Sequence, residues 1–361
     1  MKRPGKLGDP DLTLGEDPRA DARMIKVMAG LGMLGAAPEL PINAQSTIDE
    51  LLSFCEMAEP GYDLLNDQMM AGLPEVEGVV REEIEIAGTD GNEIALFMHR
   101  PRETSGRMPA ILHLHGGGMV LMSATNSLYE RWRSELAATG LIVVGVEFRN
   151  GGGRLGPHPY PAGLNDCMAA LYWLAAQRET LGYSGIVVSG ESGGGNLSLA
   201  TALRAHREGR TGNLHGVYAQ CPYISNRYLD KDPELVSLFE NDGLGMDCEL
   251  LGALARLYDP ASIHGSDPLA WPLYAQVGDL QGLPPHKISV NELDVLRDEG
   301  LAYYHKLLAA GVTASCRTIN GTTHAAEMIY RGAMPDVYLG SIRDIKGFAE
   351  DVCMGAFNDS P

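Results

Sequence analysis

Short apolar runs recur between residues 109 and 319, and amphipathic segments separate most of them. The apolar runs cover 109–115, 141–148, 185–190, 215–221, 286–293 and 313–319. Segments with helical spacing of apolar residues cover 126–140, 163–182, 196–209 and 298–311. Continuous apolar strands that alternate with such helices are typical of a parallel sheet covered on both faces. The pattern therefore predicts an α/β fold.

Residues 79–101 follow a different pattern, in which polar and apolar residues alternate on either side of the turn sequence TDGN at 89–92. This alternation predicts an antiparallel hairpin. Residues 224–283 also break the rhythm, because they contain more Pro, Asp and Leu and no clear buried strand. We interpret them as an insertion that separates two core segments, 79–223 and 284–361.

The first 78 residues are expected to form helices and loops. Met24, Val27, Met28 and Leu31 fall on one face of a predicted helix, and Ser46 is a candidate N-cap with Asp49 three residues later. A methionine-rich stripe is usually a packing surface, and the alternative is that part of it borders a substrate entrance.

Charge and composition disfavour several classes of binding partner. The 361 residues carry a formal net charge of −19, which disfavours binding to nucleic acid or to an anionic membrane surface. The six cysteines include no C-x-x-C pair, and no run of 18 apolar residues is present. The basic N-terminus is followed by acidic residues rather than an apolar segment, so it does not resemble a signal peptide. We expect a cytoplasmic protein without metal or cofactor.

Candidate chemistry centres on Ser192 in the stretch VVSGESGGGNLSL. An apolar strand, a Gly-x-Ser-x-Gly turn and a helix follow one another directly, which is the context of a nucleophile elbow. Side chains two residues before and after the serine would collide with neighbouring backbone, which explains the glycines. The alternative is a glycine-rich strand-to-helix turn with a capping serine.

A serine nucleophile needs a histidine base, held by a carboxylate, at the carboxyl edge of the sheet. His324 follows the last predicted strand in a loop, whereas the other later histidines fall in helices, at strand starts or in the insertion. Asp294 lies just past the strand at 286–293 and is our candidate acid. Asp298, which heads the next helix, is the fallback, and Glu292 is expected to belong to the strand.

The stretch LHLHGGGMV supplies candidate oxyanion donors. His115 ends a predicted strand, and Gly116, Gly117 and Gly118 form a loop whose backbone can approach a carbonyl oxygen closely.

Together, HGGG at 115–118, GESGG at 190–194, the block DVLRDEG and the late histidine resemble the hormone-sensitive-lipase family of α/β-hydrolases. The long N-terminal segment is most similar to bacterial carboxylesterases of the brefeldin A esterase type. The resemblance implies a mostly parallel eight-stranded sheet, with a helical cap contributed by residues 1–78 and 224–283.

By motif position, the resemblance implies Ser192 as nucleophile, Asp294 as acid and His324 as base. It also implies that the amides of Gly117, Gly118 and Gly193 form the oxyanion hole, with His115 and Gly116 supporting the loop.

The chain departs from the family in three places: EFRNGGGRLGPHPYP replaces the usual Tyr-Arg-Leu-Ala-Pro-Glu run, Met119 replaces an aromatic residue, and Val295 replaces a proline. The first departure contains G-x-G-x-x-G at 151–156. We expect no dinucleotide site there, because the prolines that follow prevent a helix from starting.

The sequence therefore predicts a serine carboxylester hydrolase acting on short- to medium-chain acyl esters. Two alternatives are an amidase or lactonase with the same triad, and a non-catalytic ligand receptor on this fold. The oligomeric state stays open, with a homodimer through an edge strand as the family's expectation.

Overall fold

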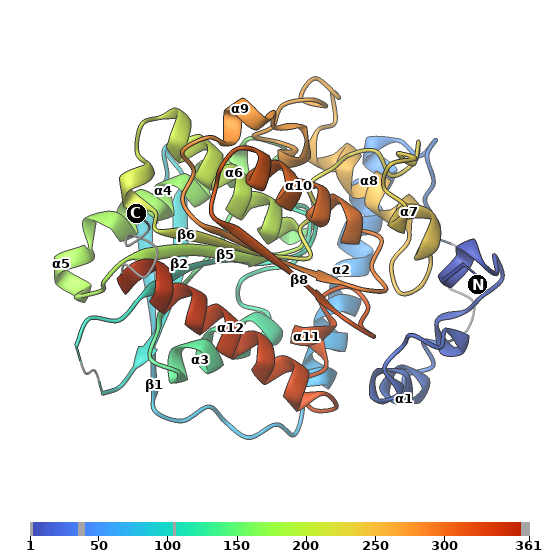
Figure 1. Ribbon diagram of the computed structural model, residues 1–361, viewed down its shortest axis with the longest axis horizontal. Coiled ribbons are helices and arrows are strands. Elements are labelled where there is room, and N and C mark those ends of the chain that lie inside the picture. The colour runs from blue at the N-terminus through green and yellow to red at the C-terminus, as the bar shows by residue number, and fades with distance from the viewer. Residues whose placement is uncertain (1–2, 35–39, 104–105, 355–361) are drawn as a thin grey trace.

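The computed structural model describes residues 3–34, 40–103 and 106–354, and its centre is one eight-stranded sheet (Figure 1). The strand order is β1-β2-β4-β3-β5-β6-β7-β8. Pairs β1–β2 and β2–β4 are antiparallel and the others are parallel, so the predicted hairpin and the predicted parallel core are both confirmed. The strands are β1 (Val79–Ala87), β2 (Glu93–Pro101), β3 (Ala110–Leu114), β4 (Ile142–Val146), β5 (Ile186–Glu191), β6 (Gly216–Gln220), β7 (His286–Asn291) and β8 (Ala314–Ile319).

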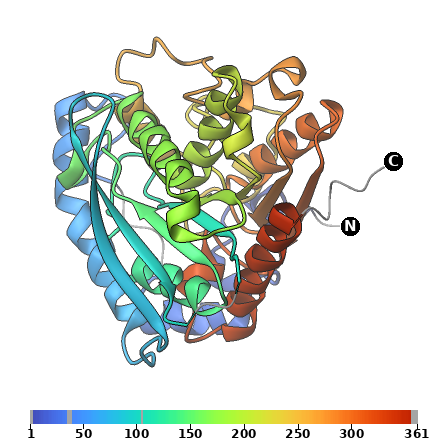
Figure 2. The ribbon, with the colours of Figure 1, turned by 90° about the vertical axis from the view of Figure 1, so that its left-hand side faces the viewer.

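Helices cover both faces of the sheet, because its central strands carry apolar residues that point alternately to either face. On one face Ile111 and Val187 pack with helices α3 (Ser127–Ala138) and α12 (Pro335–Met354). On the other face Leu112 and Val188 pack with α4 (Ala162–Ala176), α6 (Gly193–Arg207) and α10 (Arg297–Ala309). Figure 2 shows the twisted sheet with a helical layer on either side.

The register of the parallel strands aligns their carboxyl ends at one edge of the sheet. Leu114 pairs with Gly190, and Asn291 pairs with Ile319. The loops that follow β3, β5, β7 and β8 consequently leave the sheet at the same edge. These loops carry the glycine run, Ser192, Asp294 and His324, respectively.

The N-terminal segment contains helices α1 (Ala22–Gly30) and α2 (Ile48–Met70). The predicted N-cap of α2 was wrong by one residue. Thr47 caps the helix, since its hydroxyl accepts the Glu50 amide while the Glu50 carboxylate accepts the Thr47 amide. The Ser46 hydroxyl instead accepts the Asn43 amide, which closes the preceding turn.

Helix α1 buries part of the predicted methionine stripe. Met24 and Met28 are buried, whereas Leu31 is 37% exposed, because the helix ends at Gly30 and Leu31 no longer follows its period.

Residues 224–283 contain no strand, as predicted, and contribute α7 (Ser237–Glu240), α8 (Cys248–Tyr258) and α9 (Val277–Leu280). The other short helices are α5 (Arg178–Leu181) and α11 (Ala326–Ile329). Glu292 lies just outside β7, which ends at Asn291. Within the described ranges, no helix combines the length and the apolar character needed to cross a membrane.

Candidate active site

Ser192 lies on a tight turn between β5 and α6, with φ +56° and ψ −117°. A side chain at either flanking glycine would collide with β3: a Cβ atom would lie 2.4 Å from the Leu114 carbonyl oxygen at Gly190 and 1.9 Å from it at Gly194. The turn can therefore form only with glycine at both positions. The strain at Ser192 is of the kind expected of a nucleophile elbow.

His324 and Asp294 are brought together by the loops after β8 and β7. His324 Nδ1 donates to Asp294 Oδ2 over 2.7 Å, and Asp294 Oδ1 accepts the Leu296 amide over 3.0 Å. Asp298, the fallback acid, accepts instead from the Ser237 amide at 2.7 Å. Of the two candidate acids, Asp294 is thus the one hydrogen-bonded to the histidine.

The Asp294 carboxylate favours the charged form of His324. Burial opposes a charged imidazole, but the neighbouring Asp294 carboxylate and its hydrogen bond, helped by Glu327 and Glu191, outweigh burial and raise the pKa of His324 above its ordinary value. The remaining ring nitrogen, Nε2, is the atom available to take a proton from a serine hydroxyl. Ser192 and His324 line the same cavity, which has a volume of about 230 Å³.

The glycine loop lies against the first residue of α6. Gly117 and Gly118 have φ angles of +102° and +63°, which disfavour other residues. A Cβ atom at Gly193 would lie 2.8 Å from the Gly118 nitrogen and 2.5 Å from the Met119 nitrogen, so the loop backbone packs directly on Gly193. His115 Nδ1 donates to the Gly116 carbonyl oxygen over 2.8 Å. The structure thus places the loop amides beside the elbow.

Glu191, which the sequence did not point to, hydrogen-bonds this loop. Its Oε1 accepts the Gly116 amide over 2.8 Å, and its Oε2 lies 3.1 Å from His113 Nε2. The side chain is 2% exposed, and burial raises the pKa of Glu191 to about 8. The available signal was an acidic residue at the end of a buried strand, directly before the serine, because a carboxylate in so apolar a setting needs a partner.

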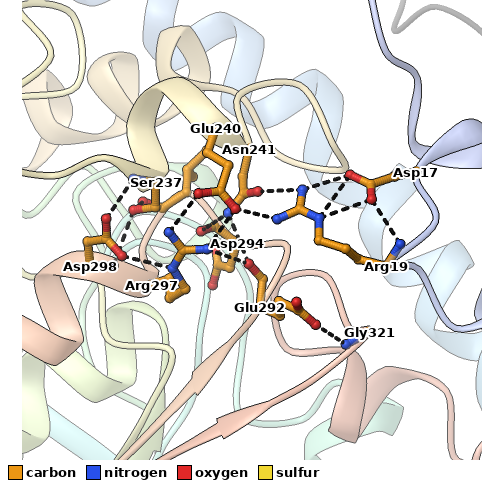
Figure 3. A network of polar contacts seen from close by, with 11 residues as sticks. Asp17, Arg19, Ser237, Glu240, Asn241, Glu292, Asp294, Arg297, Asp298 and Gly321 are labelled. Carbon is orange, nitrogen blue, oxygen red and sulfur yellow. Dashed lines mark hydrogen bonds and ion pairs between the residues drawn. The ribbon is translucent and has the colours of Figure 1, made fainter. Parts of the chain in front are cut away.

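A second missed residue, Asn241 of the insertion, supports the loop that carries the acid. Its Nδ2 donates to the main-chain oxygens of Glu292 and Asp294, each over 3.0 Å. Its Oδ1 accepts from Arg19 over 3.2 Å. Arg19 comes from the N-terminal segment, and Figure 3 shows it bonded to Asn241, which in turn bonds the acid loop.

Glu240 joins the same network. It forms ion pairs with Arg19 and with Arg297, and Arg297 also donates to the Glu292 carbonyl oxygen over 3.1 Å (Figure 3). Asp17 pairs with Arg19 at 2.7 Å. The N-terminal segment, the insertion and the core are therefore joined directly beside the acid.

The glycine-rich run 151–156 begins a 3₁₀ turn at Gly153–Leu155 and no α-helix, as predicted. Its backbone contacts a carboxylate of the chain itself: Glu59 of α2 accepts the Arg154 amide over 2.8 Å. The other oxygen of Glu59 accepts the Met122 amide over 2.7 Å. A Cβ atom at Gly153 would lie 2.9 Å from this carboxylate, so the glycine leaves room for it.

The cavity beside Ser192 has mostly apolar walls, drawn from α1, α2, α8 and the sheet edge. Part of the predicted methionine stripe borders it, because Met28 lines the cavity together with Met33 just beyond α1. The structure thus agrees with the alternative that part of the stripe borders the cavity. The other apolar side chains around the cavity are Leu65, Met69, Leu121, Met122, Leu128, Met246, Leu250, Leu251, Leu254, Ala325, Met328 and Ile329.

One group of potential metal ligands occurs among the described residues, with ligand atoms of Cys221, Asp294 and His324 within 4.8 Å of one another. Asp294 and His324 already bond to each other. Burial raises the pKa of the Cys221 thiol, which disfavours the thiolate that a metal requires. These residues are a poor fit to a metal ion.

Comparisons with known proteins agree with this fold. A profile of the α/β-hydrolase fold matches residues 111–328. Carboxylesterase NlhH of Mycobacterium tuberculosis is 34% identical over 247 residues, which are 66% of this chain and 73% of that protein. The structure of brefeldin A esterase, a bacterial homologue of human hormone-sensitive lipase, is 40% identical with a TM-score of 0.95, over 98% of this chain and 99% of that one. Esterase Est22 is 36% identical with a TM-score of 0.83, over 93% and 99%.

The contact at Gly194 predicts that Gly194→Ala destabilises the protein by about 2–4 kcal/mol, because the backbone of β3 or α6 must move to admit the methyl group. Gly347→Ala is the matched control, since Gly347 lies inside α12 with nothing within 4 Å of a new Cβ atom. It should stabilise the protein by about 0.5–1 kcal/mol. Urea unfolding measures both, and equal effects would contradict the account of the turn.

The contacts of Asn241 predict that Asn241→Ala lowers kcat on a simple ester about tenfold or more, because the acid loop loses two hydrogen bonds. Asn226→Ala is the control: Asn226 lies in the same insertion and bonds Gly265 and Tyr274. Steady-state kinetics on the same ester gives kcat for both variants. An Asn241→Ala enzyme no slower than Asn226→Ala would show that the acid loop does not need this support.

Proposed function

The chain belongs to the α/β-hydrolase fold family, and from that membership we propose that it is a serine carboxylester hydrolase acting on short- to medium-chain acyl esters. One observation carries the proposal: Ser192 occupies the strained turn and shares its cavity with a histidine that is hydrogen-bonded to a buried carboxylate.

In this proposal Ser192 Oγ attacks the ester carbonyl carbon while His324 Nε2 accepts the serine proton. The carbonyl oxygen gains the negative charge and receives hydrogen bonds from the amides of Gly117, Gly118 and Gly193. The carbon–oxygen bond to the alcohol then breaks, and His324 returns the proton to the leaving alcohol. Asp294 holds the ring tautomer and stabilises the imidazolium.

Water completes the reaction. His324 takes a proton from a water molecule, whose oxygen attacks the acyl carbon, and the same amides stabilise the second oxyanion. The bond to Ser192 Oγ breaks as His324 returns the proton to it, which releases the carboxylic acid and restores the enzyme. These roles need no metal or cofactor.

The preference for short and medium acyl chains is supported by the small volume and apolar walls of the cavity. Pockets that bind drug-sized ligands usually have volumes of about 300–1,000 Å³, and this cavity is smaller. We assign the cap to residues 1–78 and 224–283, on the core formed by 79–223 and 284–361. Met28 and Leu65 from the first segment and Leu254 from the second lie in the cavity wall, which supports this division.

An amidase or lactonase reaction on the same triad is the second candidate, because the elbow serves all acyl transfers. Rates on a matched ester and amide decide between them. The receptor alternative is disfavoured by the intact pair of His324 and Asp294. The cytoplasmic location and the homodimer stay predictions.

Ser192→Ala should lower hydrolysis of p-nitrophenyl butyrate by about a thousandfold or more, because the acyl-enzyme can no longer form. Ser198→Ala is the control. Ser198 lies in helix α6, which begins directly after Ser192, and its hydroxyl donates to the Gly194 carbonyl oxygen. Acetate, butyrate, octanoate and palmitate esters should show highest activity at the shorter chains. Full activity of Ser192→Ala would refute the proposed nucleophile.

The pH dependence of kcat/KM follows from His324. The base acts only when neutral, and its pKa is raised, so activity should rise with pH and reach half its plateau above the ordinary histidine value of about 6.5. Because the Asp294 carboxylate opposes the effect of burial, Asp294→Asn should move the residual activity's half-point to lower pH. A midpoint unchanged in Asp294→Asn would contradict this origin of the shift.

A further inference from the structure

Asn66 is an unexpected residue on the buried face of α2. The other buried residues of this helix are Leu51, Cys55 and Glu59, which follow one another at four-residue spacing, and Asn66 continues the same face two turns later. Its side chain is 4% exposed. A position of this kind is usually apolar, because burying an amide costs free energy unless its hydrogen bonds are made.

Asn66 is one of the residues that line the cavity beside Ser192 and His324. Among the described residues, no hydrogen-bond partner lies within reach of its buried Nδ2 atom. Buried polar groups of this kind are rare in proteins, and each calls for an explanation. A group of the substrate that enters the cavity would be such a partner.

Three other polar side chains around this cavity already have hydrogen-bond partners. The Tyr129 hydroxyl donates to Met122 Sδ over 3.1 Å, and the Thr323 hydroxyl donates to Met24 Sδ over 3.4 Å. Glu191 accepts the Gly116 amide. The surroundings of Asn66 along α2 are largely apolar, with Leu65 and Met69 beside it on the cavity wall. Asn66 is therefore well placed to recognise a ligand group against an apolar background.

We propose that Asn66 is a specificity-determining residue that hydrogen-bonds a second oxygen of the substrate, so that the preferred substrates are small, largely apolar esters carrying a hydroxyl or keto group away from the scissile carbonyl. This rests on the proposed function. The ester group is held at the sheet edge by Ser192 and the glycine loop, whereas Asn66 reaches the cavity from α2. An amide offers both a donor and an acceptor, which suits either oxygen group.

The test compares matched esters in the full-length protein. Two pairs place the oxygen on either side of the scissile bond: p-nitrophenyl pentanoate against p-nitrophenyl 4-oxopentanoate, and butyl acetate against 3-hydroxybutyl acetate. The measured quantity is the ratio of kcat/KM for the oxygenated ester to that for the plain ester. In Asn66→Leu this ratio should fall about tenfold for at least one pair, while kcat/KM on plain esters stays within about threefold.

Thr201→Val is the matched control. The Thr201 hydroxyl is also buried without a partner among the described residues, but it lies in α6 and away from the cavity wall. Both variants remove a buried polar group, so any general effect on stability is shared, and Thr201→Val should leave both ratios unchanged. Asn66→Ala provides a second variant should leucine overpack the site.

The outcomes separate the two proposals. Plain-ester hydrolysis with ratios that are the same in wild type, Asn66→Leu and Asn66→Ala would overturn the role of Asn66 and leave the esterase intact. A wild-type protein that hydrolyses neither plain nor oxygenated esters would overturn the proposed function, and the role of Asn66 with it. A fall in one ratio alone supports the proposal and identifies whether the acyl or the alcohol part meets Asn66.

Discussion

The close approach of three backbone segments at the Leu114 carbonyl oxygen is the constraint on which the site depends. Gly190 and Gly194 admit this oxygen because they have no Cβ atom, and β3, β5 and α6 can then pack without a gap. The same packing forces Ser192 into its strained conformation and sets Gly193 against the glycine loop. One steric condition thus positions the proposed nucleophile and the proposed oxyanion donors together.

Buried carboxylates and amides keep the remaining loops in place. Glu191 binds the glycine loop, Asn241 binds the acid loop, and Glu59 binds the turn at Met122. Each of these side chains satisfies main-chain amides or carbonyls that would otherwise be buried without partners, so a misplaced loop would lose hydrogen bonds. The catalytic geometry is held by polar contacts within an otherwise apolar core.

The wall of the cavity is built from parts of the chain that are distant in sequence. The residues proposed to perform the chemistry come from the sheet edge, whereas much of the wall comes from α1, α2 and α8. Substitutions in those helices can change which esters fit without altering Ser192 or His324. The hydrogen bonds from Arg19 to Asn241 and from Asn241 to Asp294 connect the N-terminal segment, which contributes to the wall, with the acid loop (Figure 3).

The sequence alone determined the order of strands and helices, the elbow at Ser192, the glycine loop and the histidine at 324, because short-range sterics and hydrophobic periodicity govern each of them. It favoured Asp294 as the acid with Asp298 as the fallback, and it set the α2 N-cap one residue early. The tertiary structure decided which of the two carboxylates is hydrogen-bonded to the histidine, and it is Asp294. It also found Glu191 and Asn241, whose partners lie 75 and 53 residues away, because contacts at such separations depend on packing and leave no periodic signal in the chain.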